Sequence, residues 1–219
     1  MENRNLNPKG AEETKPILVY IIAIYVAALL IANIVANYII TIGFITVSAG
    51  ILAFPLTYIL SAVLLEVFGY KWARRAAWLA LSLNAAMALT IQLVILFPHM
   101  GNPPSEYFAT AVGGTWRIIV ASLSAFAFAK FVNDVIFHKM KQKKAESGLK
   151  GFTFRAMSSS FAGHLLDSTI FTLIAFLAVV PNDSILPMIV TSFALKWAYE
   201  WLALPLTFKI VKWVKQTQN

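Results

Sequence analysis

Fifty consecutive residues near the start of the chain carry no charged side chain. Lys15 and Glu66 bound this run, and no Asp, Glu, Lys or Arg lies between them. A single helix of that length would measure about 75 Å, while the hydrocarbon core of a bilayer is about 30 Å thick. The run therefore predicts two membrane-spanning helices with a turn between them, near Gly43 and Gly50.

The composition extends this prediction to the whole chain. Hydrophobic residues make up 59% of the 219 positions and charged residues 13%, and the mean hydropathy is +0.71. In soluble domains, apolar residues make up about 45–50% of the chain and charged residues about 25%. A transmembrane helix needs about 20 mostly apolar residues. We therefore expect an all-α integral membrane protein with six transmembrane helices, at about residues 17–41, 45–68, 74–97, 116–138, 156–180 and 185–211.

Lysine and arginine are concentrated in alternate connections between these runs. They lie in the N-terminal tail, in the second and fourth loops and near the C-terminus, for example at Lys15, Arg74, Lys144 and Lys212. Because short cytoplasmic loops carry the excess of basic residues, both termini are predicted to be cytoplasmic, in a multi-pass protein of the cell (inner) membrane. The predicted organisation is a tail at 1–15, a six-helix transmembrane domain at 16–213 and a tail at 214–219. The net charge of +8 then reflects topology, and the expected partner is the lipid bilayer rather than a nucleic acid.

Two absences narrow the function. The chain has no cysteine, which excludes disulfides and thiolate metal sites. It has no Gly-x-x-x-x-Gly-Lys-Ser/Thr sequence, so it does not hydrolyse nucleotide by that route. We expect no cofactor, no metal and no enzymatic activity. A chain of this kind that moves a solute is a secondary carrier or a subunit that borrows an ATPase.

Polar side chains inside the predicted helices are the candidate functional residues. A charge near the bilayer centre costs about 2.5–3.5 kcal/mol on insertion scales, which makes each one a candidate by default. Two cations and two carboxylates balance one another, which favours pairing inside the bundle. The residues are Asn33, Asn84, Gln92, Lys130, Asn133, His164, Asp167, Lys196 and Glu200.

Four of these residues form a repeated pattern. Lys130 and Asn133 lie three residues apart, as do His164 and Asp167, so each pair shares one helix face. One interpretation is structural: Lys130 neutralises Asp167 across two packed helices, and Ser160 or a backbone carbonyl satisfies His164. The other is that both faces line a substrate cavity, because carriers place polar groups near the middle of the membrane.

Lys196 and Glu200 also allow two interpretations. Their spacing of four residues suits a salt bridge within one helix. Alternatively, Glu200 accepts N–H donors from a ligand while a neighbouring aromatic ring, such as Trp197 or Tyr199, covers the ligand's face.

Three segments resemble a known family. They are Phe54-Pro-Leu-Thr with Glu66-Val-Phe-Gly and Ala73-Arg-Arg, then Gly163-His-Leu-Leu-Asp-Ser-Thr-Ile-Phe, then Leu195-Lys-Trp-Ala-Tyr-Glu-Trp. Together they are similar to the queuosine-precursor transporters, also called vitamin uptake transporters, and the resemblance covers the six predicted helices in order. It implies a six-helix inner-membrane importer of a small planar heterocycle, a 7-deazaguanine precursor such as 7-cyano-7-deazaguanine, that is needed for tRNA modification.

The resemblance also implies site residues. It supports Pro55 in the second helix and Pro205 in the sixth, and adds Arg117 and Ser122 at the start of the fourth. A proline within a helix bends it, and such a bend either serves alternating access or is a static kink. At four positions this chain has Ala62, Lys130, Asn133 and His164, where the family usually has an acid, Gln, Asp and Gln. These departures change which hydrogen bonds a planar heterocycle would find. The expected substrate-binding set is Asn33, Phe54, Tyr58, Lys130, Asn133, His164, Asp167, Lys196 and Glu200.

Two alternatives stay open at this point. The first is the substrate-binding subunit of an energy-coupling-factor vitamin transporter, which would copurify with an ATPase module. The second is an intramembrane enzyme that uses His164 and Asp167 as an acid–base pair, although no nucleophile is evident. The sequence indicates neither the oligomeric state nor the coupling ion.

Overall fold

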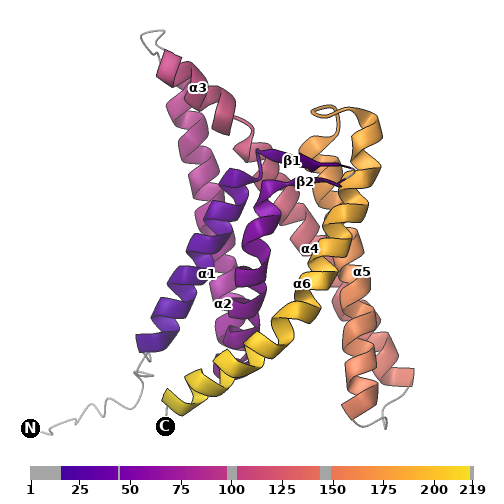
Figure 1. Cartoon of the computed structure of the whole chain (residues 1–219). Coiled ribbons are helices and arrows are strands. Elements are labelled where there is room, and N and C mark those ends of the chain that lie inside the picture. Colours follow the sequence, from indigo (N-terminus) through magenta and orange to yellow (C-terminus); the bar gives the residue numbers. More distant parts are fainter. Residues whose placement is uncertain (1–15, 44, 98–102, 144–148, 218–219) are drawn as a thin grey trace, which may run out of the picture.

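A computed structural model of the chain shows a bundle of helices with a β-hairpin at one end (Figure 1). The structure describes residues 16–43, 45–97, 103–143 and 149–217, and within them the side chains at 130, 133, 134, 137–143, 149–159, 204, 215 and 217 lie outside the description. The elements are α1 (Pro16–Val35), β1 (Ile39–Ile42), β2 (Ile45–Ser48), the 3₁₀ turn η1 (Ala49–Ala53), α2 (Phe54–Leu96), α3 (Pro103–Val112), α4 (Thr115–Lys143), α5 (Leu149–Phe176) and α6 (Asn182–Thr217).

The described residues are mostly helical, as the all-α prediction requires, and the hairpin corrects only the ends of the first two predicted helices. β1 and β2 are antiparallel, with Ile42 opposite Ile45 and Ile39 opposite Ser48. The run is rich in Ile, Thr and Val, which suit strands, and Gly43 has φ +61°, as a tight turn requires. The first predicted helix therefore ends at Val35 instead of 41, and the second begins only after η1.

A single glycine replaces the predicted second loop. Gly69 has φ 81° and ψ 171° inside α2, so it divides α2 into one helix before it and one after it. Pro55 lies in the first turn of α2, where its missing N–H breaks no helical bond, so the predicted bend at Pro55 is wrong. Pro205 does lie inside α6, as does Pro187. Figure 1 shows α6 bending, so that its C-terminal part crosses toward α1.

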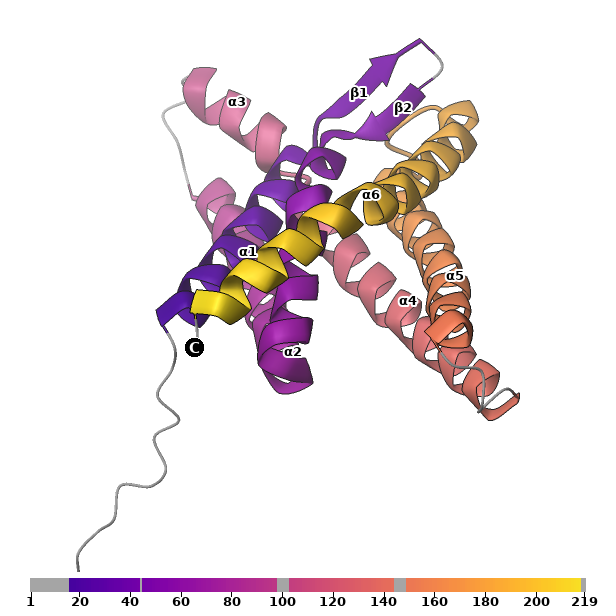
Figure 2. The same cartoon turned by 60° about the horizontal axis from the view of Figure 1, so that its bottom comes forward.

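Two buried clusters hold the helices together. One joins α1 and α2 to the end of α6, through Leu18, Val63, Leu64 and Val214 among others. The other joins the start of α4, the end of α5 and the start of α6, through residues such as Ile118, Phe176 and Met188. Figure 2 shows α4 and α5 side by side and α6 crossing in front of α1 and α2.

The start of α1 and the end of α6 lie at the same end of the molecule, opposite the hairpin (Figure 1). We call that end the terminal face. Among the described residues, three stretches are long and apolar enough to cross a membrane: Pro16–Val35, Ala49–Leu96 and Pro103–Ala129. Large apolar side chains such as Leu93 and Phe208 are exposed, as expected where a helix faces lipid. Each of the six predicted spans falls mainly in a helix, and the short helix α3 was not predicted.

Candidate functional site

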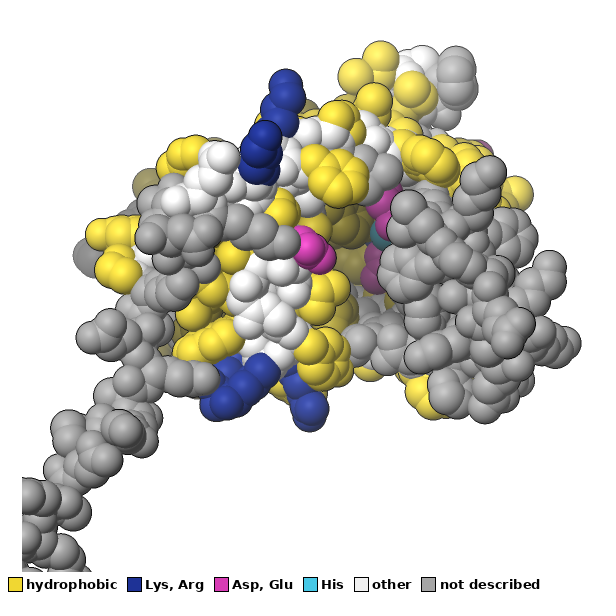
Figure 3. Space-filling view, turned by 90° about the horizontal axis from the view of Figure 1, so that it is seen from below, with side chains coloured by type: hydrophobic (Ala, Val, Ile, Leu, Met, Phe, Trp, Pro, Cys, Tyr) yellow, Lys and Arg dark blue, Asp and Glu magenta, His cyan; other side chains and the backbone are white. Residues whose placement is uncertain are grey.

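A cavity of about 500 Å³ lies between α1, α2, α4, α5 and α6. That volume suits a small organic ligand. Seen from the terminal face, a hollow in the surface exposes apolar side chains and, deeper, acidic side chains and a histidine (Figure 3). The polar and aromatic lining includes Asn33, Ser48, Phe54, Thr57, Tyr58, Ser61, Ser122, Phe126, Ser160, His164, Asp167, Phe171, Ser192 and Lys196.

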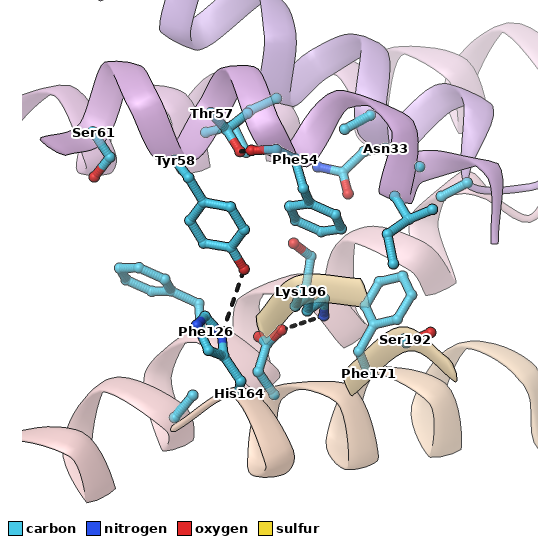
Figure 4. A pocket seen from close by; sticks show the side chains of 18 of the residues that line it. Asn33, Phe54, Thr57, Tyr58, Ser61, Phe126, His164, Phe171, Ser192 and Lys196 are labelled. Atoms are coloured by element: carbon cyan, nitrogen blue, oxygen red, sulfur yellow. Dashed lines mark hydrogen bonds and ion pairs between the residues drawn. The ribbon is translucent and has the colours of Figure 1, made fainter. Parts of the chain in front are cut away.

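Aromatic rings form one wall of the cavity. Phe54 and Tyr58 are one turn apart at the start of α2, so both point from the same helix face. Their ring centroids are 5.9 Å apart and the ring planes differ by 27°. Figure 4 shows both rings projecting from α2 toward His164 and Phe171 on the opposite side. A flat ligand could stack on such a wall.

An ion pair joins α5 to α6 in the opposite wall. Lys196 Nζ donates to Asp167 Oδ2 at 2.5 Å. The Lys196 side chain is 3% exposed and that of Asp167 is 26% exposed, so the ammonium is buried while the carboxylate reaches the cavity. The ammonium also lies 4.9 Å from the centre of the Phe54 ring, a cation–π distance. The aromatic wall and the ion pair thus support one another.

A second polar cluster lies beside that ion pair. Ser160 Oγ is 2.8 Å and 2.9 Å from the two carboxylate oxygens of Glu200, and His164 Nε2 is 3.0 Å from Oε2. On its other side, His164 Nδ1 is 3.5 Å from the Tyr58 hydroxyl. We call Tyr58, Ser160, His164 and Glu200 the histidine cluster. It connects α2, α5 and α6 through polar contacts.

A buried amide pair connects α1 to the second half of α2. Asn33 Nδ2 donates to Asn84 Oδ1 at 2.6 Å, and Asn84 Nδ2 donates to the Ala80 carbonyl at 2.8 Å. Asn33 also lines the cavity. This asparagine therefore has a structural partner and a face toward any ligand.

The structure brings together most of the expected set. Six of the nine expected residues line the cavity: Asn33, Phe54, Tyr58, His164, Asp167 and Lys196. Glu200 is held behind them by Ser160 and His164. The side chains of Lys130 and Asn133 lie outside the described residues.

One of the sequence interpretations is corrected. The salt bridge between Lys196 and Glu200 within α6 is wrong, because Lys196 is bonded to Asp167 and Glu200 to Ser160 and His164. The pairing of Lys130 with Asp167 concerns a side chain outside the described residues. Contacts between helices form in place of the contact within α6, because α5 places a carboxylate next to Lys196 and places a hydroxyl and an imidazole next to Glu200. The spacing of residues along the sequence can identify a partner on the same helix, but it does not identify a partner on another helix.

Arg117 and Ala62 are not in the cavity lining. Arg117 Nε donates to the Ile174 carbonyl at 2.6 Å and its Nη2 to the Leu177 carbonyl at 2.5 Å. The guanidinium thus satisfies carbonyls at the C-terminus of α5, which lack partners within the helix. Ser122, another position supported by the resemblance, does line the cavity.

The sequence reasoning missed several cavity residues. Ser160 was considered only as a partner of His164, yet it bonds both oxygens of Glu200. Phe171 also lines the cavity. Each lies four residues from a recognised site residue, Ser160 before His164 and Phe171 after Asp167, so helical spacing was the available signal.

The arrangement is suited to binding a small polar ligand. Among the described residues, no group of three His, Cys, Asp or Glu side chains could hold a metal ion. The cavity offers a carboxylate acceptor, an ammonium, an imidazole and an amide, next to stacked aromatic rings. Such a set can recognise a flat molecule with several hydrogen-bonding edges.

Comparisons with known proteins agree with this chemistry. A family profile described as "Putative vitamin uptake transporter" matches residues 48–210. Among curated proteins, the "Probable queuosine precursor transporter" of Bacillus subtilis (strain 168) is 25% identical over 175 residues, which cover 80% of this chain and 76% of that protein. No solved structure matches this chain significantly.

Proposed function

The chain belongs to the vitamin uptake transporter family, and on that premise we propose that it is a secondary carrier that imports queuosine or a related 7-deazaguanine precursor, such as 7-cyano-7-deazaguanine, for tRNA modification. The name of the Bacillus subtilis relative supports this substrate class. The observation that carries the proposal is the cavity, where aromatic rings face paired acidic and basic groups between the helices.

The proposed binding mode uses both walls. A 7-deazaguanine has adjacent N–H donors on one edge, which a carboxylate accepts well, and a flat face that stacks on aromatic rings. Asp167 is the proposed acceptor at the cavity surface, and Phe54 with Tyr58 is the proposed stacking wall. Lys196 or His164 is the proposed donor to the carbonyl side of the ligand, while Asn33 can serve either edge.

The proposed orientation places the terminal face in the cytoplasm. Lys71, Arg74 and Arg75 lie next to the Gly69 break, and Lys209 and Lys212 lie near the end of α6. A bilayer retains such basic segments on its cytoplasmic side. The hollow in Figure 3 then opens inward, and the described state corresponds to an inward-facing carrier. Gly69 and Pro205 are the proposed points of bending during alternating access.

Uptake by cells tests the proposal. Cells that can neither make nor import 7-deazaguanine precursors are supplied with labelled 7-cyano-7-deazaguanine and the wild-type chain, Asp167→Asn or Glu200→Gln. We expect the wild type to restore uptake and each variant to lower it by about tenfold or more, since a hydrogen bond to a charged group contributes about 1.5–3 kcal/mol.

Thr169→Ala is the control, because its hydroxyl donates to the Leu165 carbonyl of its own helix in an exposed hydrogen bond and does not line the cavity. The proposal fails if the wild type restores no uptake or if both carboxylate variants transport as well as the wild type. Uptake that requires a copurifying ATPase module would instead identify an energy-coupling-factor subunit.

A further inference from the structure

The two carboxylates near the cavity differ in the kind of partner they have. Asp167 is bonded to Lys196, and a lysine ammonium carries its charge throughout the physiological pH range. Glu200 is bonded to Ser160, which is neutral, and to His164. Histidine carries a positive charge only when it is protonated, and its ordinary pKa lies near neutral pH. The compensation of the Glu200 charge therefore depends on a proton.

We propose that His164 and Glu200 form the proton-binding site that couples this carrier to a transmembrane proton gradient, an inference that rests on the proposed transport function. When His164 is neutral, the described charged groups Asp167, Lys196 and Glu200 leave one net negative charge between the helices. When the pair binds a proton, that charge is neutralised. Among the described contacts of Glu200, a charged imidazole offsets the carboxylate, and such pairing lowers the cost of a charge inside a membrane protein.

The geometry accommodates both protonation states. In either state Nε2 can carry the hydrogen that it shares with Glu200 Oε2, 3.0 Å away. Nδ1 then accepts from the Tyr58 hydroxyl when the imidazole is neutral and donates to it when the imidazole is charged, across 3.5 Å. A tyrosine hydroxyl can do both, because it is a donor and an acceptor. Ser160 holds the carboxylate of Glu200 in place throughout.

Water can deliver the proton. Ser160 and His164 line the cavity, and the side chains of His164 and Glu200 are 13% and 29% exposed. The histidine and acidic groups are visible inside the hollow of the terminal face (Figure 3). The pair is therefore buried enough for its charge to matter and open enough to exchange protons.

The surroundings contribute other charges, and each is accounted for within the described side chains. The residues of α4 that line the cavity, Ser122, Phe126 and Ala129, have no ionisable group, and the side chain of Lys130 lies outside the description. From the remaining helices, the other titratable or charged groups that line the cavity are Tyr25 of α1, Tyr58 of α2, Asp167 of α5 and Lys196 of α6.

The position of the pair links the proton to helix movement. The contact between His164 and Glu200 joins α5 to α6, and Pro205 follows five residues later inside α6. A proline removes a helical hydrogen bond and leaves a bend that can move. Beyond that bend, α6 packs against α1 and α2 through Val211 and Val214. Gain or loss of the proton thus changes the α5–α6 contact next to a flexible point. In one transport cycle, the pair takes a proton from water outside with the substrate and releases it to water inside.

Steady-state accumulation in proteoliposomes tests the coupling. The purified full-length chain is reconstituted with potassium and valinomycin to hold the membrane potential at zero, and the interior is set one pH unit above the exterior. Labelled 7-cyano-7-deazaguanine is then added. For one proton per substrate, the expected ratio of inner to outer concentration is about tenfold, since one pH unit corresponds to about 1.4 kcal/mol.

His164→Gln and Glu200→Gln are the test variants. Each amide keeps hydrogen-bonding groups but cannot take part in the proton equilibrium, so both ratios are expected to fall to one. A steady-state ratio does not depend on the speed of transport, so slower variants remain informative. Thr169→Ala, on the exposed side of α5, is the control and should keep the tenfold ratio.

Each result decides the question. A tenfold ratio for the wild type and the control, with a ratio of one for both glutamine variants, supports the proton site. A wild-type ratio of one with intact exchange of labelled precursor at equal pH overturns the coupling and leaves the proposed function standing. A tenfold ratio in His164→Gln overturns the assignment to this pair. Absence of both exchange and accumulation overturns the proposed function, and the coupling with it.

Discussion

Lys196 contacts three other residues of the cavity wall. Its ammonium bonds Asp167 and lies near the rings of Phe54 and Phe171, at 4.9 Å and 5.8 Å from their centres. A buried cation of this kind gains from its partner about what it lost on leaving water. Its removal therefore leaves a carboxylate without compensation rather than a mere gap.

We predict that Lys196→Met destabilises the protein strongly and that adding Asp167→Asn restores most of the loss. Breaking one side of a buried pair costs about 3–5 kcal/mol, whereas replacing both sides is often nearly neutral. Thermal unfolding in detergent should give a much lower Tm for the single variant than for the double variant. Equal Tm values for the two would show that the ion pair has no role in stability. Uptake should stay low in both.

Arg117 illustrates a residue of the family pattern whose role in the structure is to cap a helix. Its guanidinium donates to the carbonyls of Ile174 and Leu177 at the end of α5. A lysine cannot form the same planar fork, so Arg117→Lys should lower the Tm and leave the KM for 7-cyano-7-deazaguanine unchanged. A changed KM with an unchanged Tm would point to a role in binding instead.

At the level of elements, the β-hairpin and η1 sit close to α1. A Cβ added at Gly50 would meet the Ala32 carbonyl oxygen at 2.7 Å and the Ala36 Cβ at 3.0 Å. Ser48, just before η1, donates to the Ala36 carbonyl at 3.0 Å. Both Ser48 and Gly50 line the cavity, so the fit of η1 against α1 shapes that end of the cavity.

Two glycine substitutions separate crowding from backbone strain in this region. Gly50→Ala should raise the KM for uptake of 7-cyano-7-deazaguanine, because η1 must move away from α1. Gly43→Ala is the matched change: its Cβ would meet nothing within 4 Å, although φ is +61°, so it should cost about 1–2 kcal/mol of stability and leave the KM unchanged. The reverse order of KM effects would exclude η1 as part of the cavity wall.

The elements also show what the sequence could and could not predict. Apolar run length located the helices, because each must satisfy its own backbone groups in lipid. Run length did not predict the hairpin of residues 39–48, because hydropathy alone does not distinguish a strand rich in Ile and Thr from a helix. The gap between two apolar runs also predicted a loop of several residues, whereas in the structure Gly69 alone interrupts the helix.

The site was predictable as a set of residues but not as a set of pairs. The cost of burying polar groups in a membrane identified Asp167, Lys196, His164 and Glu200. Which carboxylate meets which cation depends on how α5 and α6 are rotated and shifted against each other, and spacing along one helix carries no such information. The pairs Asp167 with Lys196 and Glu200 with His164 are therefore evident only from the three-dimensional structure.

For the whole molecule, the proposed orientation can be tested directly because the chain has no cysteine. Single-cysteine variants therefore report one position each. Ile42→Cys, in the hairpin and 70% exposed, should react with a membrane-impermeant maleimide in intact cells. Arg74→Cys, exposed near Gly69, should react only in inside-out vesicles. The opposite labelling pattern would reverse the orientation and place the hollow on the outside.

The two polar contacts between α5 and α6 have a consequence for how the chain is made. On insertion scales each charge near the membrane centre costs about 2.5–3.5 kcal/mol, so α6 leaving the translocon alone would carry a penalty of about 5–7 kcal/mol for Lys196 and Glu200. Asp167 and His164 on α5 can offset it only if α5 is still alongside, and only residues 177–181 connect the two helices. The nascent chain would then release α5 and α6 into lipid as one helical hairpin, after its ribosome has synthesised the chain as far as the end of α6.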